Sequence, residues 1–360
     1  MAETTSPGDG APARTPVQRL TLGAEDAGQR LDKVLTRLLP LVPRSHLFRL
    51  LRKGEVRVNG KRASADLRVA EGDELRLPPL RIETVPEGEA PRRPVPRRLI
   101  EQVESAIVHQ DERLLVIDKP AGIAVHGGSG VSFGVIEALR ASRPEETLEL
   151  VHRLDRDTSG CLLVARRRSS LRALHALLRE DAFDKRYLAL LKGKWELGAK
   201  LIDAPLNTEA RVGGERTVRV DPRGKAAASQ FKVVQFFGRL ATLVEVNLLT
   251  GRTHQIRVHA AHAGHPVAGD PKYGDEAFNA QMRELGLTRL FLHAHSTSWP
   301  DVDRQVEVSV NAPLPDELKR VLDATASAAE RKVRPAGAPA GQQGLRAAKS
   351  PPRAGRRRAR

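Results

Sequence analysis

Reactive side chains are concentrated at residues 151–160, where the sequence reads VHRLDRDTSG. Two carboxylates, Asp155 and Asp157, alternate there with the guanidiniums of Arg153 and Arg156. The segment lies between two apolar runs, LELVH and CLLVA, and loops held by strands often bear functional groups. A carboxylate among arginines stays ionised at neutral pH, as a nucleophile or a general base requires. A structural network of Asp–Arg ion pairs that closes a turn is an equally open interpretation.

If the segment is extended, Arg153, Asp155 and Asp157 share one face.

Two other patterns are weaker indications of a functional site. His259, His262 and His265 suggest a metal site, but their segment contains no acidic residue that could orient them. The glycines at 127–130 lack the GK[ST] of a phosphate-binding loop and indicate a flexible loop facing the substrate. We therefore predict no metal site and no cofactor.

The elements that must position these residues form a long domain at 100–325. Its strand-like runs are LLVID, LELVH, CLLVA, YLALL, ATLVEVNLL, LFLHA and VEVSV. Helical patterns interleave with them at 132–141, 169–180, 253–263 and 316–323, with Ser132, Ser169 and Thr253 as N-caps. Clustered strands with few helices between them favour an α+β domain with a mostly antiparallel mixed sheet.

A smaller module precedes this domain at residues 17–85. Two helical patterns are followed by GEVRVNGKRA, where Asn59-Gly60 predicts a type I′ hairpin, and then by the strand-like GDELRL. The module is rich in basic residues and has one acid, Glu55, among them, which indicates binding to a polyanion. The basic candidates are Arg44, Arg49, Arg52, Lys53, Arg57, Lys61 and Arg62.

Charge and composition indicate which segments are disordered and to which class of protein the chain belongs. The 360 residues have a formal net charge of +16, and ten basic residues but no acidic one lie in the last thirty. The sequence predicts a disordered leader at 1–16, a Pro/Arg-rich linker at 86–99 and a disordered basic tail at 326–360. We expect no membrane-spanning segment. The single cysteine, Cys161, is typical of the reducing cytoplasm.

Both domains resemble known families. RLDKVL, PRSHLFRLLRKGEVRVNGK and EGDELRL resemble an S4 RNA-binding domain, a small α/β unit. HRLDRDTSG, together with VIDKPAGIAVH, DKRYLALLKG, TGRTHQIRVH and GHPVAGDPKYG, resembles the RluA-type RNA pseudouridine synthases over nearly the whole second domain. HGGSGVSFGVIEALRASRPEE and FLHAH are similar to members of that family that modify 23S rRNA. The resemblance implies the pseudouridine synthase fold behind an S4 domain.

The resemblance also assigns catalytic roles. It makes Asp155 the catalytic residue of a reaction that breaks the uridine N1–C1′ bond, turns the base and joins C5 to C1′. Whether Asp155 adds to the sugar or begins by proton transfer stays open. Tyr187 is expected to stack on the flipped base, and Arg252 to pair with Asp155. No cofactor is implied.

RNA contacts follow from the same resemblance. Arg153 is expected to help open the RNA stack, since chemistry on a base requires its extrusion, while His254 and Arg257 could contact backbone phosphate. The expected partner is 23S rRNA or the assembling large ribosomal subunit, with no protein partner and a monomeric enzyme. Two other functions stay open: a non-catalytic S4-type ribosome-assembly factor, and a hydrolase that uses Asp155 with Asp157.

Overall fold

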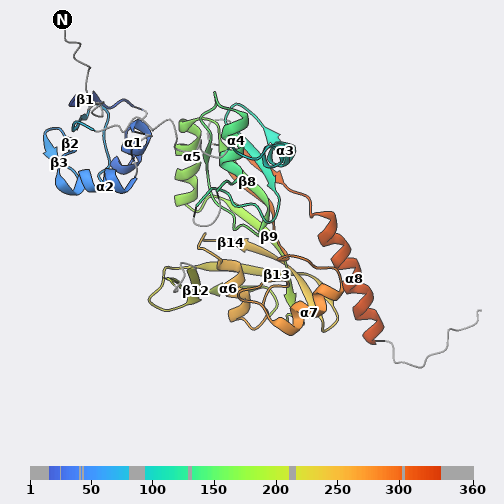
Figure 1. Cartoon of the computed structure of the whole chain (residues 1–360). Helices are drawn as coiled ribbons and strands as arrows, with labels where there is room; N and C mark the ends of the chain where they lie inside the picture. The colour runs from blue at the N-terminus through green and yellow to red at the C-terminus, as the bar shows by residue number, and fades with distance from the viewer. Residues whose placement is uncertain are drawn as a thin grey trace, which may run out of the picture. The chain divides into compact units, whose positions relative to one another are not determined.

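A computed structural model describes residues 16–24, 26–39, 42, 44–80, 94–128, 132–210, 216–301 and 305–333. The chain divides into two compact units, Met1–Arg97 and Arg98–Arg360, which we describe separately (Figure 1). Nearly all of the predicted leader, the linker up to residue 93, the glycine loop at 129–131 and the tail from residue 334 lie outside the described residues.

The N-terminal unit is a four-stranded antiparallel sheet packed against two helices. In chain order its elements are β1 (Gln18–Thr21), α1 (Leu31–Leu38), α2 (Arg44–Lys53), β2 (Arg57–Val58), β3 (Lys61–Arg62) and β4 (Glu74–Leu77), with sheet order β1-β4-β2-β3. Asn59 and Gly60 both have positive φ, 49° and 74°, which confirms the hairpin turn. Leu31, Leu35 and Leu75 are fully buried in its core.

The second unit is built on one sheet of ten strands. The strands are β5 (Ile107–Gln110), β6 (Leu114–Lys119), β7 (Glu149–Leu150), β8 (Ser159–Ala165), β9 (Asp184–Lys192), β10 (Lys200–Asp203), β13 (Ala228–Phe237), β14 (Ala241–Leu248), β15 (Leu292–Asp301) and β16 (Val306–Asn311). The order is β10-β13-β14-β9-β15-β8-β6-β5, with β16 beside β15 and β7 beside β8. A separate hairpin joins β11 (Leu206–Ala210) to β12 (Arg216–Val220). Among the described strand pairs only β8 and β15 run parallel, which confirms the mostly antiparallel α+β prediction.

Six helices accompany this sheet within the described residues, two more than the sequence predicted. They are α3 (Arg97–Ser105), α4 (Val135–Ser142), α5 (Arg168–Arg179), α6 (Gln255–His262), α7 (Glu276–Glu284) and α8 (Asp316–Val333). The unexpected helices are α3, which begins inside the predicted linker, and α7. The predicted N-caps are wrong, since Gly134, Arg167 and His254 precede α4, α5 and α6. No helix within the described residues has the length and apolar character to cross a membrane.

The boundary of the disordered tail also requires correction. Helix α8 continues to Val333, eight residues into the segment predicted to be disordered from 326. Ala326 and Ala329 pack against the core that contains Leu318 and Val321, and this burial extends a helix of good helix formers.

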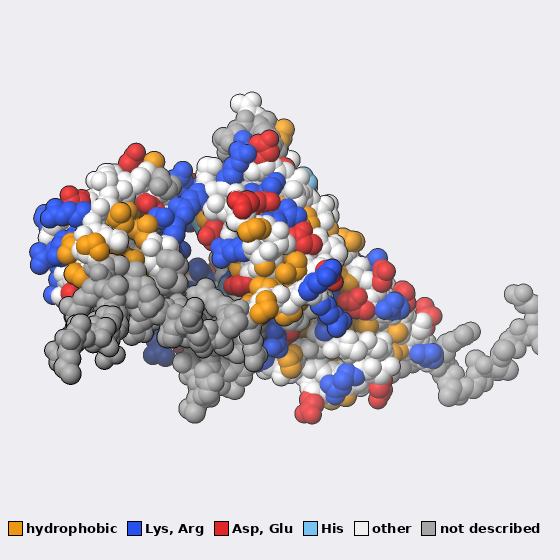
Figure 2. Space-filling model, turned by 45° about the horizontal axis from the view of Figure 1, so that its top comes forward, with side chains coloured by type: hydrophobic (Ala, Val, Ile, Leu, Met, Phe, Trp, Pro, Cys, Tyr) orange, Lys and Arg blue, Asp and Glu red, His pale blue; other side chains and the backbone are white. Residues whose placement is uncertain are grey.

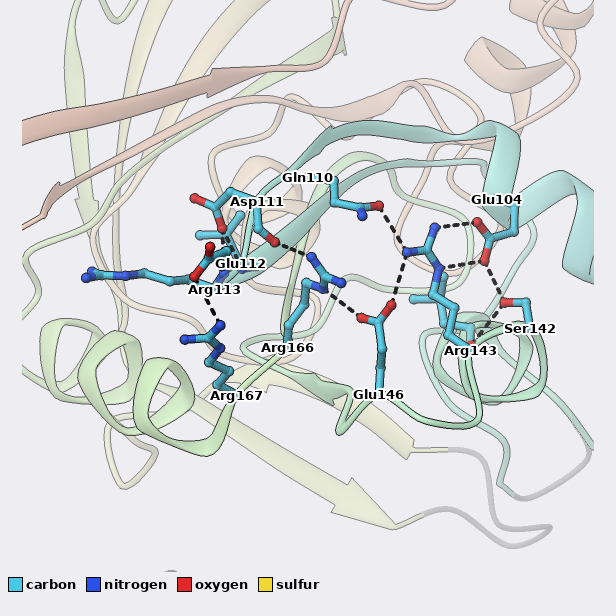
Figure 3. A network of polar contacts seen from close by, with 12 residues as sticks. Glu104, Gln110, Asp111, Glu112, Arg113, Ser142, Arg143, Glu146, Arg166 and Arg167 are labelled. Carbon is cyan, nitrogen blue, oxygen red and sulfur yellow. Dashed lines mark hydrogen bonds and ion pairs between the residues drawn. The ribbon is translucent and has the colours of Figure 1, made fainter.

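An ion-pair network joins segments of the second unit that are distant in sequence (Figure 3). Arg143, which follows α4, pairs with Glu104 of α3 (2.7 Å) and with Glu146 (3.4 Å). Arg166, which follows β8, pairs with Glu146 (2.6 Å) and donates to the backbone carbonyl of Asp111. These arginines connect α3, α4 and the ends of β5 and β8, so they help to fix the strand that follows the reactive loop.

Candidate active site

The loop between β7 and β8 is held by hydrogen bonds to β8. Val151 donates its N–H to the carbonyl of Leu163 (3.0 Å), and the N–H of Leu163 donates to Nε2 of His152 (3.2 Å). Burial lowers the pKa of His152 to about 4, so its ring is a neutral acceptor at neutral pH. Within the loop, the N–H of Thr158 donates to the carbonyl of Asp155 (3.2 Å). The loop is therefore a turn rather than the extended segment considered from the sequence.

In this turn the two carboxylates have different neighbours. Asp155 lines a cleft together with Arg153, whereas Asp157 pairs with its neighbour Arg156 (3.1 Å) and its side chain is 35% exposed. The expectation that Arg153, Asp155 and Asp157 share one face is wrong, because the alternation of an extended chain does not apply in a turn. The paired-carboxylate hydrolase loses its geometric basis.

Lys119, the last residue of β6, connects the reactive loop to the loop that follows β6. Its side chain is buried, and its Nζ donates to the carbonyls of Pro120 (2.8 Å), Ile123 (2.8 Å) and Arg156 (3.0 Å). Burial lowers the pKa of Lys119 to about 7, and the two carboxylates of the neighbouring loop oppose that shift. This lysine lies in the motif VIDKPAGIAVH, but the sequence reasoning assigned it no role.

One cleft collects the predicted substrate-contacting residues of the second unit. It encloses about 500 Å³ of space that is open to solvent, between the reactive loop, β9, the end of β14 and the start of α6. Its lining includes Arg153, Asp155, Tyr187, Arg252, His254 and Arg257. The antiparallel pairing of β9 with both β14 and β15 brings these segments together, since Tyr187 lies opposite Val246 and Ala294.

Asp155 faces two nitrogen-bearing side chains of the α6 segment. Nη1 of Arg257 lies 3.8 Å from its Oδ2, and Nε2 of His254 lies 3.9 Å from the same oxygen. Arg257 is itself held by Asp270, whose two oxygens accept from Nε and Nη2 of Arg257, both at 2.7 Å. Burial would lower the pKa of Arg257, but the hydrogen bonds and charge of Asp270 raise it, so the guanidinium stays charged.

Two expectations about the α6 segment are corrected by this arrangement. Arg252 was expected to pair with Asp155, but Nε of Arg252 donates to the carbonyl of Ala226 (2.9 Å) and the arginine beside Asp155 is Arg257. Arg257 was expected to contact RNA phosphate, but it is only 6% exposed, is held by Asp270 and faces Asp155. Both differences arise because the helix beginning at Gln255 directs Arg257 inward, while Arg252 lies in the exposed turn before it.

Gln255 fixes that turn and was missed by the sequence reasoning. Its Oε1 accepts from the N–H of Arg252 (3.0 Å) and the hydroxyl of Thr250 (2.7 Å). Its Nε2 donates to the carbonyl of Ala228 (2.9 Å) and to Oγ of Ser229 (2.9 Å). This buried amide is satisfied at both ends, so it attaches the start of α6 rigidly to β13. The quoted motif TGRTHQIRVH contained it.

Tyr187 forms an apolar wall of the cleft. It is 8% exposed, and burial raises its pKa, an effect that the nearby charge of Asp155 reinforces. The phenol is therefore neutral at physiological pH. The stacking of Tyr187 on a flipped base stays a prediction.

The basic residues of the N-terminal unit lie on α2 and the β2–β3 hairpin. Arg49, Arg52, Lys53, Arg57, Lys61 and Arg62 are exposed, and the side chain of Arg44 lies outside the described residues. Lys53 approaches Glu55 at 3.8 Å, and the guanidinium of Arg62 donates to the carbonyl of Arg52. Figure 2 shows blue Lys and Arg side chains along the outer edge of this unit. Their role in RNA binding stays a prediction.

The histidine repeat has structural partners. His259 is buried and contacts Oγ of Ser229 (3.1 Å) and the carbonyl of Ala204 (3.0 Å). Nδ1 of His265 contacts the carbonyl of Lys192 (2.8 Å). Within the described part of the chain, no group of three or more His, Cys, Asp or Glu side chains has an arrangement that could hold a metal ion.

Comparisons with known proteins match a family model in each of the two units. Residues 113–262 match the family model described as RNA pseudouridylate synthase, and residues 29–75 match the S4 domain. The chain is 50% identical over 311 residues to ribosomal large subunit pseudouridine synthase C of Pasteurella multocida, covering 86% of this chain and 94% of that protein. Its identity to the Escherichia coli K12 protein of that name is 48% over 310 residues, covering 85% and 96%.

A solved structure is also similar. Human RNA Pseudouridylate Synthase Domain Containing 4 has a TM-score of 0.53 and 26% sequence identity, covering 63% of this chain and 95% of that one.

Proposed function

The chain belongs to the RNA pseudouridylate synthase family, and from that premise we propose that it isomerises specific uridines of 23S rRNA with Asp155 as its catalytic residue. The observation that supports this role is the position of Asp155 in the cleft, beside the charged Arg257 and the neutral ring of Tyr187. The substrate is proposed from the relatives, which are named for the large ribosomal subunit.

The reaction leaves the atomic composition of the nucleotide unchanged. The N1–C1′ bond breaks, the C5–C1′ bond forms, and the proton lost from C5 is balanced by one gained at N1. Two routes can begin at the carboxylate of Asp155: addition to C1′ of the sugar, or removal of a proton. No electrons are exchanged with another molecule, so the isomerisation needs no redox cofactor, and we propose that the side chains of the cleft carry it out without a metal.

The target base must leave the RNA stack to enter the cleft, which costs a few kcal/mol. We propose that Arg153, exposed at the cleft, helps to hold the opened RNA, and that Tyr187 stacks on the flipped base. The exposed Lys and Arg side chains of the N-terminal unit would supply further phosphate contacts. We further propose that the enzyme acts in the cytoplasm, as a monomer, on free rRNA or on an assembling subunit.

The experiment that tests the proposal compares Asp155→Asn with Asp157→Asn on transcribed 23S rRNA in excess chelator. Wild type should form pseudouridine, and Asp155→Asn should lose at least about 10³-fold in turnover, because the reacting carboxylate is gone. Its RNA affinity should stay within a few-fold, since phosphate gains nothing from a negative neighbour. Asp157→Asn is the matched control and should stay close to wild type, because Asp157 pairs on the surface.

Three results would contradict the proposal. Substantial turnover by Asp155→Asn would remove Asp155 as the catalytic group. An equal loss in both variants would favour a reaction that uses two carboxylates. Tight rRNA binding without any pseudouridine from wild type would favour the non-catalytic assembly factor.

A further inference from the structure

His254 has an unusual backbone conformation that places its ring between Asp155 and a second tyrosine. It precedes α6 with φ 54° and ψ 19°, the left-handed region that few non-glycine residues adopt. Its Nδ1 lies 2.8 Å from the hydroxyl of Tyr273, and its Nε2 lies 3.9 Å from Oδ2 of Asp155. The ring therefore spans from the hydroxyl of Tyr273 to the proposed catalytic carboxylate.

The hydrogen bonds of Tyr273 favour one position for the proton on the ring of His254. The hydroxyl oxygen of Tyr273 accepts the N–H of Val218 (3.0 Å), and burial raises the pKa of this tyrosine, so the phenol keeps its proton. That proton is available for Nδ1 of His254, which then acts as an acceptor. In a neutral ring the remaining proton is on Nε2, the nitrogen that faces Asp155.

The surroundings favour the neutral ring. Burial lowers the pKa of His254, and the positive charges of Arg257 and Lys272 lower it further, while Asp155 and Asp270 oppose the shift. The side chain of His254 is 17% exposed. A neutral imidazole with its proton on Nε2 can donate to a carboxylate without neutralising it.

From this geometry we infer that His254 is a positioning residue, which Tyr273 keeps in the Nε2–H form so that it directs the carboxylate of Asp155. His254 and Arg257 approach the same oxygen, Oδ2, and this leaves Oδ1 as the reacting oxygen. The separation of 3.9 Å exceeds a hydrogen bond, but such contacts commonly shorten when substrate binds. The inference rests on the proposed role of Asp155.

Two amide substitutions distinguish this role from a structural one. In His254→Gln the amide nitrogen can reach the place of Nε2, whereas in His254→Asn it reaches only the place of Nδ1. Both residues tolerate the required backbone, since Gln305 (φ 53°) and Asn59 (φ 49°) have similar angles in this chain. The two variants differ in donor position, and because Asn adopts the left-handed region more readily than Gln, any extra backbone cost affects the variant that is expected to keep its rate.

Single-turnover rates at saturating 23S rRNA should separate them. We expect His254→Asn and His254→Ala to lose about 10- to 100-fold, the scale of a misplaced catalytic group, and His254→Gln to stay within about fivefold of wild type. RNA affinity should not change. Tyr273→Phe should lower the single-turnover rate when His254 is present. In the His254→Gln background it should lower that rate little further, because that variant no longer needs the tyrosine to place its donor.

Nitrogen NMR of histidine-labelled wild type gives an independent readout that needs no variant to be active. The His254 signal, assigned by its absence in His254→Gln, should show the Nε2–H form at pH 7. An Nδ1–H form, a protonated ring, or equal rates for Gln and Asn would overturn the inference. Weaker RNA binding with unchanged rates would instead make His254 a phosphate contact. If wild type forms no pseudouridine, the proposed function itself fails.

Discussion

At the scale of single residues, the two carboxylates that contact Arg257 differ sharply in distance. Asp270 is bound to Arg257 at 2.7 Å through both oxygens, while Asp155 lies 3.8 Å away. Asp270 therefore supplies the close partner that a buried guanidinium needs, and Asp155 receives the positive field without a tight ion pair. A carboxylate that is not bound closely stays available for a substrate.

Removing the charge of Asp270 tests this division of roles. Asp270→Asn leaves Arg257 buried without its close partner, and breaking such a pair costs about 3–5 kcal/mol of unfolding free energy. Urea unfolding at pH 7, followed by the fluorescence of Trp195 and Trp299 in the second unit, measures the loss. Asp157→Asn is the control and should change the unfolding free energy by less than about 1 kcal/mol, as is typical of surface pairs.

The same pair predicts a pH dependence. Burial alone would raise the pKa of Asp270, but hydrogen bonds and charge from Arg257 leave it below its ordinary value of 3.8. A carboxyl whose pKa is depressed by folding stabilises the protein above 3.8, and that stability is lost as the pH falls through the lower folded value. Wild type should therefore lose more unfolding free energy between pH 5 and pH 3 than Asp270→Asn does. Parallel pH profiles would contradict the assignment.

At the scale of elements, the reactive loop depends on the parallel pairing of β8 with β15. Gly160 has φ +108° and lies against Ala294, so that a Cβ at this glycine would be 2.2 Å from the carbonyl oxygen of Ala294. Next to it, Oγ of Ser159 contacts Nδ1 of His293 at 2.9 Å. The strand that follows the loop can therefore approach β15 only with a glycine at this position.

Gly160→Ala should cost about 4 kcal/mol or more, at the upper end for single substitutions. Gly286→Ala is a matched control, because Gly286 also has a positive φ (+90°) but nothing lies within 4 Å of its added Cβ. This control should cost only about 1–2 kcal/mol, the price of a left-handed backbone. Thermal or urea unfolding of the second unit compares them. Equal losses would show that backbone strain, and not the close contact, sets the cost.

Local patterns predicted most of the elements. The two helical patterns of the N-terminal module predicted α1 and α2, Asn59-Gly60 predicted the hairpin, and the strand-like run ATLVEVNLL predicted β14 (Ala241–Leu248). Helix α7 was missed, and the end of α8 was placed too early, because burial against a distant core stabilises both. Such burial leaves little trace in a short window of sequence.

The site was predictable in its members but not in its pairings. The motifs contained Asp155, Tyr187 and Arg257, and the structure brings them to one cleft. They also contained Asp270 and Tyr273, to which no role was assigned. Which arginine meets Asp155 depends on where α6 begins and which way its first turn faces, and a sequence spacing does not specify that direction.

At the scale of the whole molecule, two basic regions should contribute differently to RNA recognition. The tail at 331–360 holds ten basic residues, of which only Arg331 and Lys332, at the end of α8, lie within the described residues. Each phosphate contact it makes should change log affinity by about 0.7 per unit of log salt on single-stranded RNA. Deleting it should weaken binding and flatten the salt dependence without changing which uridines are modified.

Deleting residues 17–85 should have a different effect. This unit presents its basic side chains on an ordered helix and hairpin, so its loss should reduce selection among rRNA sites as well as affinity. Pseudouridine maps at matched occupancy compare the two truncations. A changed site pattern after loss of the tail, with an unchanged pattern after loss of the N-terminal unit, would reverse these roles.

The central claim is that this chain makes pseudouridine in 23S rRNA through Asp155. The most direct test maps pseudouridines at single-nucleotide resolution in rRNA from cells with the gene, without it, and complemented by wild type, Asp155→Asn or Asp157→Asn. Particular 23S sites should disappear without the gene and return with wild type and Asp157→Asn, but not with an equally abundant Asp155→Asn. An unchanged map without the gene, or full restoration by Asp155→Asn, would contradict it.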